Sequence, residues 1–146
     1  MNKMIEVKTA DLIGLALDWA TGVADGRELE LPGAFKGRTS VVWCDPFVIR
    51  REGHPEFHDK TRRKWEPSTN GGQSMELIIK YQIAIISEAH DGLEGTEMSD
   101  RWYADVYYGG GQQYTTEHCN TALVAACRAI VGTVFGDTVS VPAELI

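Results

Sequence analysis

One run of the sequence constrains the fold more than any other: residues 120–135, NTALVAACRAIVGTVF, in which Arg128 is the only charged side chain. Large apolar side chains recur along this run at a helical period, and small residues fill the remaining positions. The pattern predicts a helix that the rest of the chain covers on nearly every side, with Asn120 as its N-cap and Gly136 at its end. Arg128 then needs either a buried acidic partner or a route to solvent at the edge of the core.

A second helix is predicted at residues 10–24, where apolar side chains again recur at a helical period. Thr9 offers a side-chain oxygen as its N-cap, and the pair of Asp25 and Gly26 provides a stop. Because this helix also carries small residues, we expect it to pack against the small-residue face of the 120–135 helix.

Short strands are predicted where β-branched and aromatic residues alternate with polar ones. They fall at residues 4–7, 28–31, 39–44, 101–108 and 138–141. Asp45 and Pro46 are expected to end the third of these strands, which residues 47–49 can resume, and a polar loop is expected to follow the fourth. Residues 73–88 fit either a helix followed by a strand, which would pair with 101–108 as a hairpin, or one continuous helix.

These elements predict one α+β domain over residues 1–146, in which two main helices pack on a small, mostly antiparallel sheet. Residues 53–66 are polar, contain Pro55 and show no clear period. We therefore interpret the wider segment 32–66 as an insertion or an extended, exposed excursion from that domain.

Composition restricts the partners and the compartment. The net charge of −7 argues against nucleic acid as the main partner, because phosphate binding relies on clustered lysine and arginine. The three cysteines are scattered and odd in number, which agrees with a reducing compartment. No stretch approaches the length of a membrane span, and the first residues lack the pattern of a secretory signal. We expect a cytoplasmic protein with no membrane partner.

The charge is unevenly distributed along the chain. Residues 50–64 hold six of the fourteen basic side chains, whereas residues 88–105 hold six acids against the single Arg101. Two solvated loops of opposite sign would explain this, and so would a complementary pair within the chain or between subunits. Nucleic-acid contact through residues 50–64 is a weaker hypothesis, because the overall charge disfavours it.

Catalytic and metal-binding motifs are weak in this sequence. His54 and His58 have a spacing that suits two metal ligands, but Pro55 lies between them and no third ligand is evident. His118 and Cys119 precede a predicted helix, yet adjacent side chains rarely meet as a catalytic pair. We therefore expect no enzymatic activity, no metal and no cofactor.

The loop at residues 68–73 fits two interpretations, a binding site for a small ligand or an ordinary structural loop. Its residues Ser68, Thr69, Asn70, Gly72 and Gln73 are small or polar and can expose backbone N–H groups beside side-chain oxygens. An ordinary loop has the same composition. If the N-terminus of the 120–135 helix lies nearby, Asn120, Thr121 and Arg128 would complete the site.

Several segments, taken in their order along the chain, resemble the NinX-like family of small bacteriophage proteins. The matching pieces lie at residues 8–26, 67–73, 78–79, 102–104 and 121–145. Residues 32–64 have no counterpart in this resemblance, which is consistent with an insertion. The resemblance implies a phage or prophage accessory protein that acts in the cytoplasm of the bacterial host, and it implies no catalytic residues.

The function we expect is a non-catalytic interaction module that binds a host or phage protein, or a second copy of itself. Tyr103 and Tyr107 support this hypothesis, because the alternation of their strand places them on the face opposite Trp102. Tyrosine on an outer sheet face suits protein contacts. The alternative remains a ligand-binding or enzymatic domain with its site at the 68–73 loop.

Overall fold

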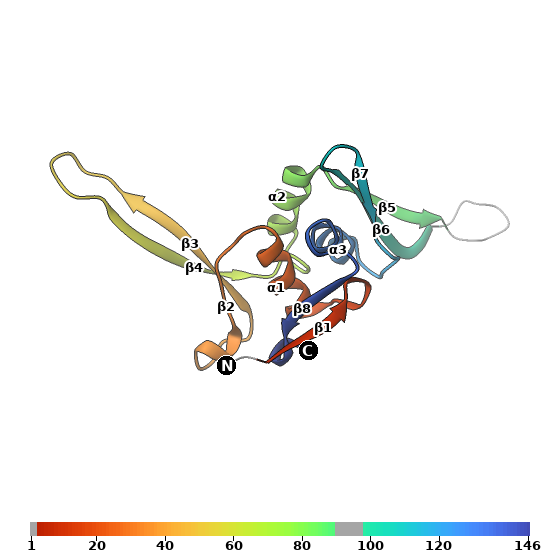
Figure 1. The fold of residues 1–146 in the computed structure, drawn as a ribbon, viewed down its shortest axis with the longest axis horizontal. Helices are drawn as coiled ribbons and strands as arrows, with labels where there is room; N and C mark the ends of the chain where they lie inside the picture. Colours follow the sequence, from red (N-terminus) through yellow and green to blue (C-terminus); the bar gives the residue numbers. More distant parts are fainter. Residues whose placement is uncertain (1–2, 90–97) are drawn as a thin grey trace.

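The computed structural model describes residues 3–89 and 98–146. Within those ranges the chain forms three α-helices: α1 (Gly14–Ala24), α2 (Gly71–Tyr81) and α3 (Ala122–Phe135). The strands are β1 (Met4–Lys8), β2 (Leu29–Glu30), β3 (Val41–Ile49), β4 (Phe57–Trp65), β5 (Ala84–Ala89), β6 (Met98–Tyr108), β7 (Gln112–Thr115) and β8 (Thr138–Pro142). Short 3-10 helices occur at η1 (Thr9–Asp11), η2 (Pro32–Ala34) and η3 (Ala143–Leu145). Figure 1 shows α3 near the middle of the body, surrounded by the other elements.

The described strands form three separate antiparallel sheets, with strand orders β1-β8, β2-β3-β4 and β5-β6-β7. The first of these sheets joins the two ends of the chain. The prediction of an α+β fold is confirmed, but the arrangement of two helices on one sheet is wrong. A third helix is present, and the strands are divided among three small sheets because α3 needs cover on several sides.

Two apolar clusters meet at α3. Ala125, Ala126 and Ala129 pack in one cluster with Ala104 and Val106 of β6. The opposite side of α3 contributes Cys127 and Val131 to a second cluster, in which Ala16, Leu17 and Ala20 of α1 lie. The predicted contact between α1 and α3 is confirmed. The expectation that α1 covers the small face is wrong, because that face packs mainly against the β5-β6-β7 sheet, where small side chains allow close approach.

Both long helices begin differently from the prediction. The Thr9 hydroxyl donates to the carbonyl of Gly136 at 2.7 Å instead of capping a helix, so residues 9–11 form η1 and α1 starts only at Gly14. In α3 the N-cap is Thr121, whose hydroxyl oxygen accepts from the Val124 amide at 3.1 Å, and Asn120 lies outside the helix. The Thr9 hydroxyl therefore bonds a partner far away in the sequence, whereas the Thr121 hydroxyl caps its own helix.

Residues 71–89 form a helix and then a strand, which excludes the single continuous helix. The hairpin of β5 with β6 is confirmed. The polar loop expected after β6 is wrong in part, because Gln112–Thr115 returns as β7 and pairs with residues 105–108. The strand β7 is held by main-chain pairing with β6. Its four residues are mostly polar and exposed, so the sequence shows no apolar period there.

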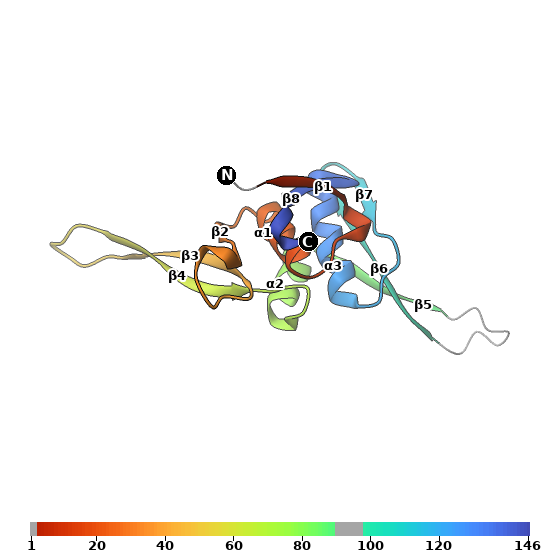
Figure 2. The ribbon, with the colours of Figure 1, turned by 90° about the horizontal axis from the view of Figure 1, so that it is seen from below.

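The predicted end of β3 at Pro46 and the lack of regular structure in 53–66 are both wrong. β3 continues through Pro46, which lies opposite Lys60 in a nine-residue pairing of β3 with β4. Proline is tolerated there because β2 pairs with β3 only at Val42 and Trp43, so that β3 is an edge strand at Pro46. We call residues 41–65 the arm. Figures 1 and 2 show it projecting from the body, at the end opposite to the β5-β6 hairpin.

Candidate functional site

The side chains of Asn70 and Gln73 in the 68–73 loop are engaged in local structure. The Asn70 side chain caps α2 by accepting from the Gln73 amide at 3.1 Å. The side chain of Gln73 accepts from the Glu66 amide at 2.8 Å and donates to the Lys64 carbonyl at 2.7 Å. These bonds connect the end of β4 to the first turn of α2.

The same loop covers a buried carboxyl group. The Ser68 amide donates to Oδ1 of Asp18 at 2.9 Å, and Asp18 is 3% exposed within α1. Burial raises the pKa of Asp18 to about 6, and the hydrogen bonds from Ser68 only partly oppose that rise. The carbonyl of Asp18 also accepts from the indole nitrogen of Trp65 at 2.9 Å. The loop therefore joins α1, α2 and the root of the arm.

The three other predicted site residues meet at a pocket beside the N-terminus of α3. Asn120, Thr121 and Arg128 line a cavity of about 440 Å³, together with Ala10, Ile13, His118, Cys119 and Val124. Arg128 is 7% exposed, and its Nε donates to the Leu12 carbonyl at 2.9 Å. Its partner is thus a backbone carbonyl at the junction of η1 and α1, neither of the two alternatives that the sequence left open.

The structure therefore divides the predicted site residues into two groups. Asn120, Thr121 and Arg128 share the α3 pocket, whereas none of the residues 68–73 lines it. The pocket also contains Ile13, His118 and Cys119, which the sequence did not connect with Arg128. Its assembly depends on the bond between Arg128 and Leu12, which are 116 residues apart, and no local motif indicates such a contact.

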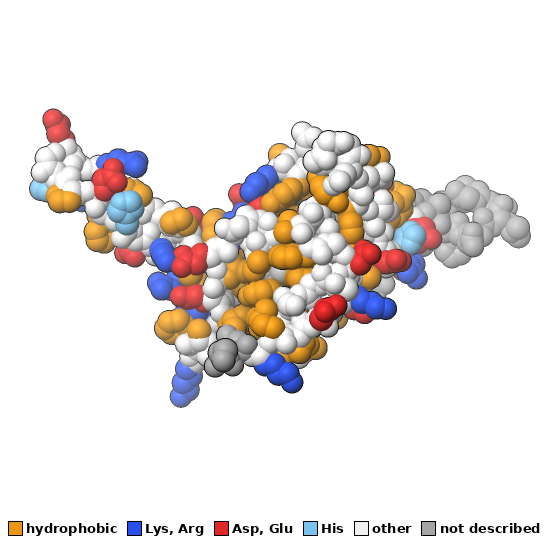
Figure 3. All heavy atoms as spheres, in the orientation of Figure 1, with side chains coloured by type: hydrophobic (Ala, Val, Ile, Leu, Met, Phe, Trp, Pro, Cys, Tyr) orange, Lys and Arg blue, Asp and Glu red, His pale blue; other side chains and the backbone are white. Residues whose placement is uncertain are grey.

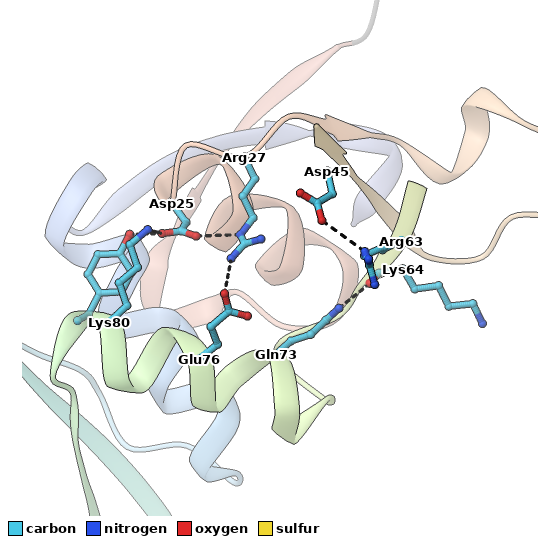
Figure 4. A network of polar contacts seen from close by, with 9 residues as sticks. Asp25, Arg27, Asp45, Arg63, Lys64, Gln73, Glu76 and Lys80 are labelled. Carbon is cyan, nitrogen blue, oxygen red and sulfur yellow. Dashed lines mark hydrogen bonds and ion pairs between the residues drawn. The ribbon is translucent and has the colours of Figure 1, made fainter. Parts of the chain in front are cut away.

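A polar network that the sequence did not reveal lies where the arm meets the body (Figure 4). The Arg27 guanidinium carbon lies 4.0 Å from the ring centre of Trp43 and 4.2 Å from that of Trp65. Its Nε also pairs with Asp25 at 2.8 Å, and Lys80 approaches the same carboxylate at 2.7 Å. A cation packed against two indole rings attaches both arm strands to the residues that follow α1.

Charge within this network is balanced. Burial alone would raise the pKa of Asp25, but hydrogen bonds from Lys80 and Tyr81 and the charge of Arg27 hold that pKa below its ordinary value. Burial and the hydrogen bond to Asp25 raise the pKa of Tyr81. The neighbouring cavity of about 340 Å³ is lined by Arg27 and Lys80, and both cations already pair with acids of the chain, Lys80 with Asp25 and Arg27 with Asp25 and Glu76. We therefore interpret the network as a structural connection.

The outer part of the arm is exposed and partly apolar. Phe47, Val48, Ile49 and Phe57 are large apolar residues with between 37% and 54% of their surface exposed. Phe57 and Ile49 also line a cavity of about 450 Å³ at the tip, which His54 borders as well. Figure 3 shows apolar side chains along the arm with charged ones beside them.

Most of the basic side chains on the arm are paired. Four ion pairs involve them: Arg50 with Glu56 at 2.9 Å, Lys60 with Glu28 at 2.7 Å, Arg62 with Glu30 at 3.1 Å and Arg63 with Asp45 at 3.5 Å. For Arg51 and Lys64 no ion pair with another described residue is found. The basic segment is therefore largely neutralised by acids of its own chain.

Comparison with known proteins places the chain among bacteriophage proteins. The model of a family described as "Bacteriophage P22, NinX" matches residues 8–133. The chain belongs to this family. A comparison with curated proteins gives no match. The family membership confirms the resemblance drawn from the ordered segments of the sequence, and it includes both the α3 pocket and the arm within the matched range.

Two further observations concern the surface and the histidines of this phage protein. Tyr107 is 66% exposed on β6, whereas Tyr103 packs edge to face on His118, with ring centres 5.0 Å apart.

His54 and His58 lie at the exposed tip of the arm, and His58 is 3.3 Å from Glu56. Across residues 3–89 and 98–146, no group of three or more His, Cys, Asp or Glu side chains is placed to hold a metal ion. In the same ranges no helix has the length and apolar character needed to cross a membrane.

Proposed function

We propose that this phage protein is a non-catalytic interaction module that acts in the host cytoplasm and binds a protein partner through the distal part of its arm. The observation that carries the proposal is the exposed apolar face near the arm tip. In the register of the arm, Ile49 lies opposite Phe57, and Phe47 is two residues away on the same strand face. These three side chains form a continuous apolar strip, which we call the tip strip.

A covering partner would also explain how the outer arm keeps its shape. A two-stranded hairpin on its own is at best marginally stable in water. Beyond Asp45 every described residue of β3 and β4 up to Lys64 is exposed, so the body gives this part little apolar support. Partner contacts on the tip strip would supply the missing apolar burial.

Charge favours a protein over a nucleic acid as the occupant. Because four of the basic arm side chains already pair with acids, few remain for phosphate groups. Arg51, which follows β3 at the arm tip, suits an individual carboxylate beside the apolar contact, whereas Lys64 lies opposite Val42 at the root of the arm. The expected partner surface is an apolar depression bordered by acidic side chains, on a host protein, another phage protein or a second copy of this acidic chain.

Site-specific crosslinking tests this proposal. A photo-crosslinking amino acid is placed at position 57 in the arm or, as a matched control, at position 79, where Ile79 is also exposed but lies on α2. In host cells carrying the phage, we expect a discrete protein adduct from position 57 that disappears when Phe47 is changed to Ser. The molar mass of the purified protein in solution then shows whether the partner is a second copy.

The contrary result is equally specific. If position 57 gives no more adduct than position 79 and the purified chain is monomeric, the arm does not bind a protein partner under these conditions and the proposal fails. An adduct with nucleic acid instead of protein would also overturn it.

A further inference from the structure

Arg128 is a buried cation without an acidic partner. Within the described part of the chain, its guanidinium makes one hydrogen bond, from Nε to the Leu12 carbonyl, and no ion pair. That bond uses one of five N–H donors, and both terminal nitrogens remain available. Because Arg128 lines the α3 pocket, its remaining donors and its charge are presented to that cavity. A largely buried cation with a single carbonyl partner favours an anion beside it.

The same cavity receives the positive end of a helix. Thr121 and Val124 belong to the cap and first turn of α3, a helix of 14 residues, Asn120 directly precedes the cap, and all three line the pocket. The first amides of a helix lack intrahelical acceptors, and the helix dipole favours negative charge there. The Thr121 hydroxyl accepts from the Val124 amide but can still donate its own hydrogen.

Among the residues that the structure describes, none in the lining is acidic and would compete for these donors. Ile13 and Val124 contribute an apolar side, and the asparagine and threonine supply further hydrogen-bonding groups. The volume of about 440 Å³ lies within the usual range for small-molecule pockets. The cavity thus combines a forked cation, helix N–H donors and room for a small organic group.

We propose that the α3 pocket is a binding site for a small oxyanion, a phosphate or carboxylate group held between the Arg128 guanidinium and the first turn of α3. The planar fork of arginine suits both kinds of group, because it can donate two parallel hydrogen bonds to a pair of oxygens. The apolar side at Ile13 and Val124 would contact the remainder of the ligand. The site lies on the body of the protein and does not depend on the function proposed for the arm.

Anion titration followed by backbone amide NMR tests the site. Inorganic phosphate and acetate are added separately to the full chain, and sodium chloride keeps the ionic strength constant so that general screening does not change. We expect saturable shifts confined to the amides of residues 10–13 and 118–128, which line or adjoin the pocket, and the anion with the higher affinity identifies the preferred group.

Variants separate binding from folding. Arg128→Gln removes the charge directly, but it also weakens the bond to Leu12 and endangers the fold. Asn120→Asp avoids this difficulty, because Asn120 is exposed and a carboxylate near a helix N-terminus does not destabilise the helix. Its new charge should repel the anion and raise the dissociation constant about tenfold or more. Asn70→Asp makes the same change at the N-cap of α2 and should leave anion binding unaltered.

The outcomes decide the matter either way. Saturable binding of phosphate or acetate that Asn120→Asp weakens and Asn70→Asp preserves supports the site. Equal affinity in Asn120→Asp and the unmodified chain would refute it. Shifts that chloride reproduces, or that do not saturate with either anion, would refute it as well.

Discussion

Replacing Asp18 with asparagine should make this protein more stable at neutral pH. Asp18 is buried in α1, and the folded protein holds its carboxyl at a pKa of about 6, compared with an ordinary value of 3.8. The main cause is burial, which disfavours the charged form, and the nearby charge of Glu66 adds to it. Because asparagine retains an oxygen acceptor, the hydrogen bond from the Ser68 amide can remain.

The sign and size follow from linkage. The folded state binds the Asp18 proton more tightly than the unfolded state, so the contribution of Asp18 to stability is fully present below pH 3.8 and is lost as the pH rises through about 6. A difference of one pKa unit corresponds to 1.36 kcal/mol, so the shift amounts to about 3 kcal/mol. Above pH 7 the unmodified chain carries this whole penalty, whereas Asp18→Asn carries none of it.

Urea unfolding at a series of pH values measures the effect. We expect the free energy of unfolding of Asp18→Asn, relative to the unmodified chain, to rise by up to about 3 kcal/mol between pH 4 and pH 8. Asp11→Asn is the matched control, because Asp11 is an exposed acid in η1 and its replacement should not produce this rise. If the difference between Asp18→Asn and the unmodified chain does not change with pH, the raised pKa of the buried Asp18 carboxyl is refuted.

Two smaller changes test the packing and the capping of α3. Gly132→Ala should destabilise the fold by about 1–3 kcal/mol, because the added Cβ would lie 2.1 Å from a ring carbon of Tyr114. If the free energy of unfolding in urea is unchanged, the Tyr114 ring moves aside without loss of stability and the prediction is wrong. Thr121→Ala should lower the free energy of unfolding by about 1 kcal/mol through loss of the N-cap, whereas Asn120→Ala should have little effect; the reverse order in thermal or urea unfolding would contradict the assignment of Thr121 as the cap.

Sequence patterns predicted the elements whose burial is periodic. The apolar arc of residues 120–135 indicated α3 and its end, and the alternation at 101–108 indicated β6, with Ala104 and Val106 buried. In these segments the core selects one face, so the period of apolar residues reports the structure directly. Which face of α3 packs against α1 was harder to predict. Both faces of α3 are apolar, and side-chain size alone did not show which one meets α1.

The arm and the pocket were harder to predict for different physical reasons. β4, with the sequence FHDKTRRKW, is exposed along almost its entire length, and its strand form rests on main-chain pairing with β3. Without a buried face there is no apolar period to read. Asn120, Thr121 and Arg128 are close in sequence and line one pocket, whereas the loop at 68–73 was joined to them only by an assumed proximity that the pocket lining does not show.

The contrast between the two halves of the arm bears on its role. At the root, Trp65 is 1% exposed and its indole N–H donates to the backbone carbonyl of Asp18, while Arg27 packs against Trp65 and Trp43. The root is therefore fixed to the body by buried aromatic, cationic and hydrogen-bonded contacts. A loosely attached hairpin would need no such anchoring. Because the root holds the arm in one direction, the apolar side chains at Phe47 and Phe57 are presented at a defined distance from the body, which lowers the ordering cost of binding there.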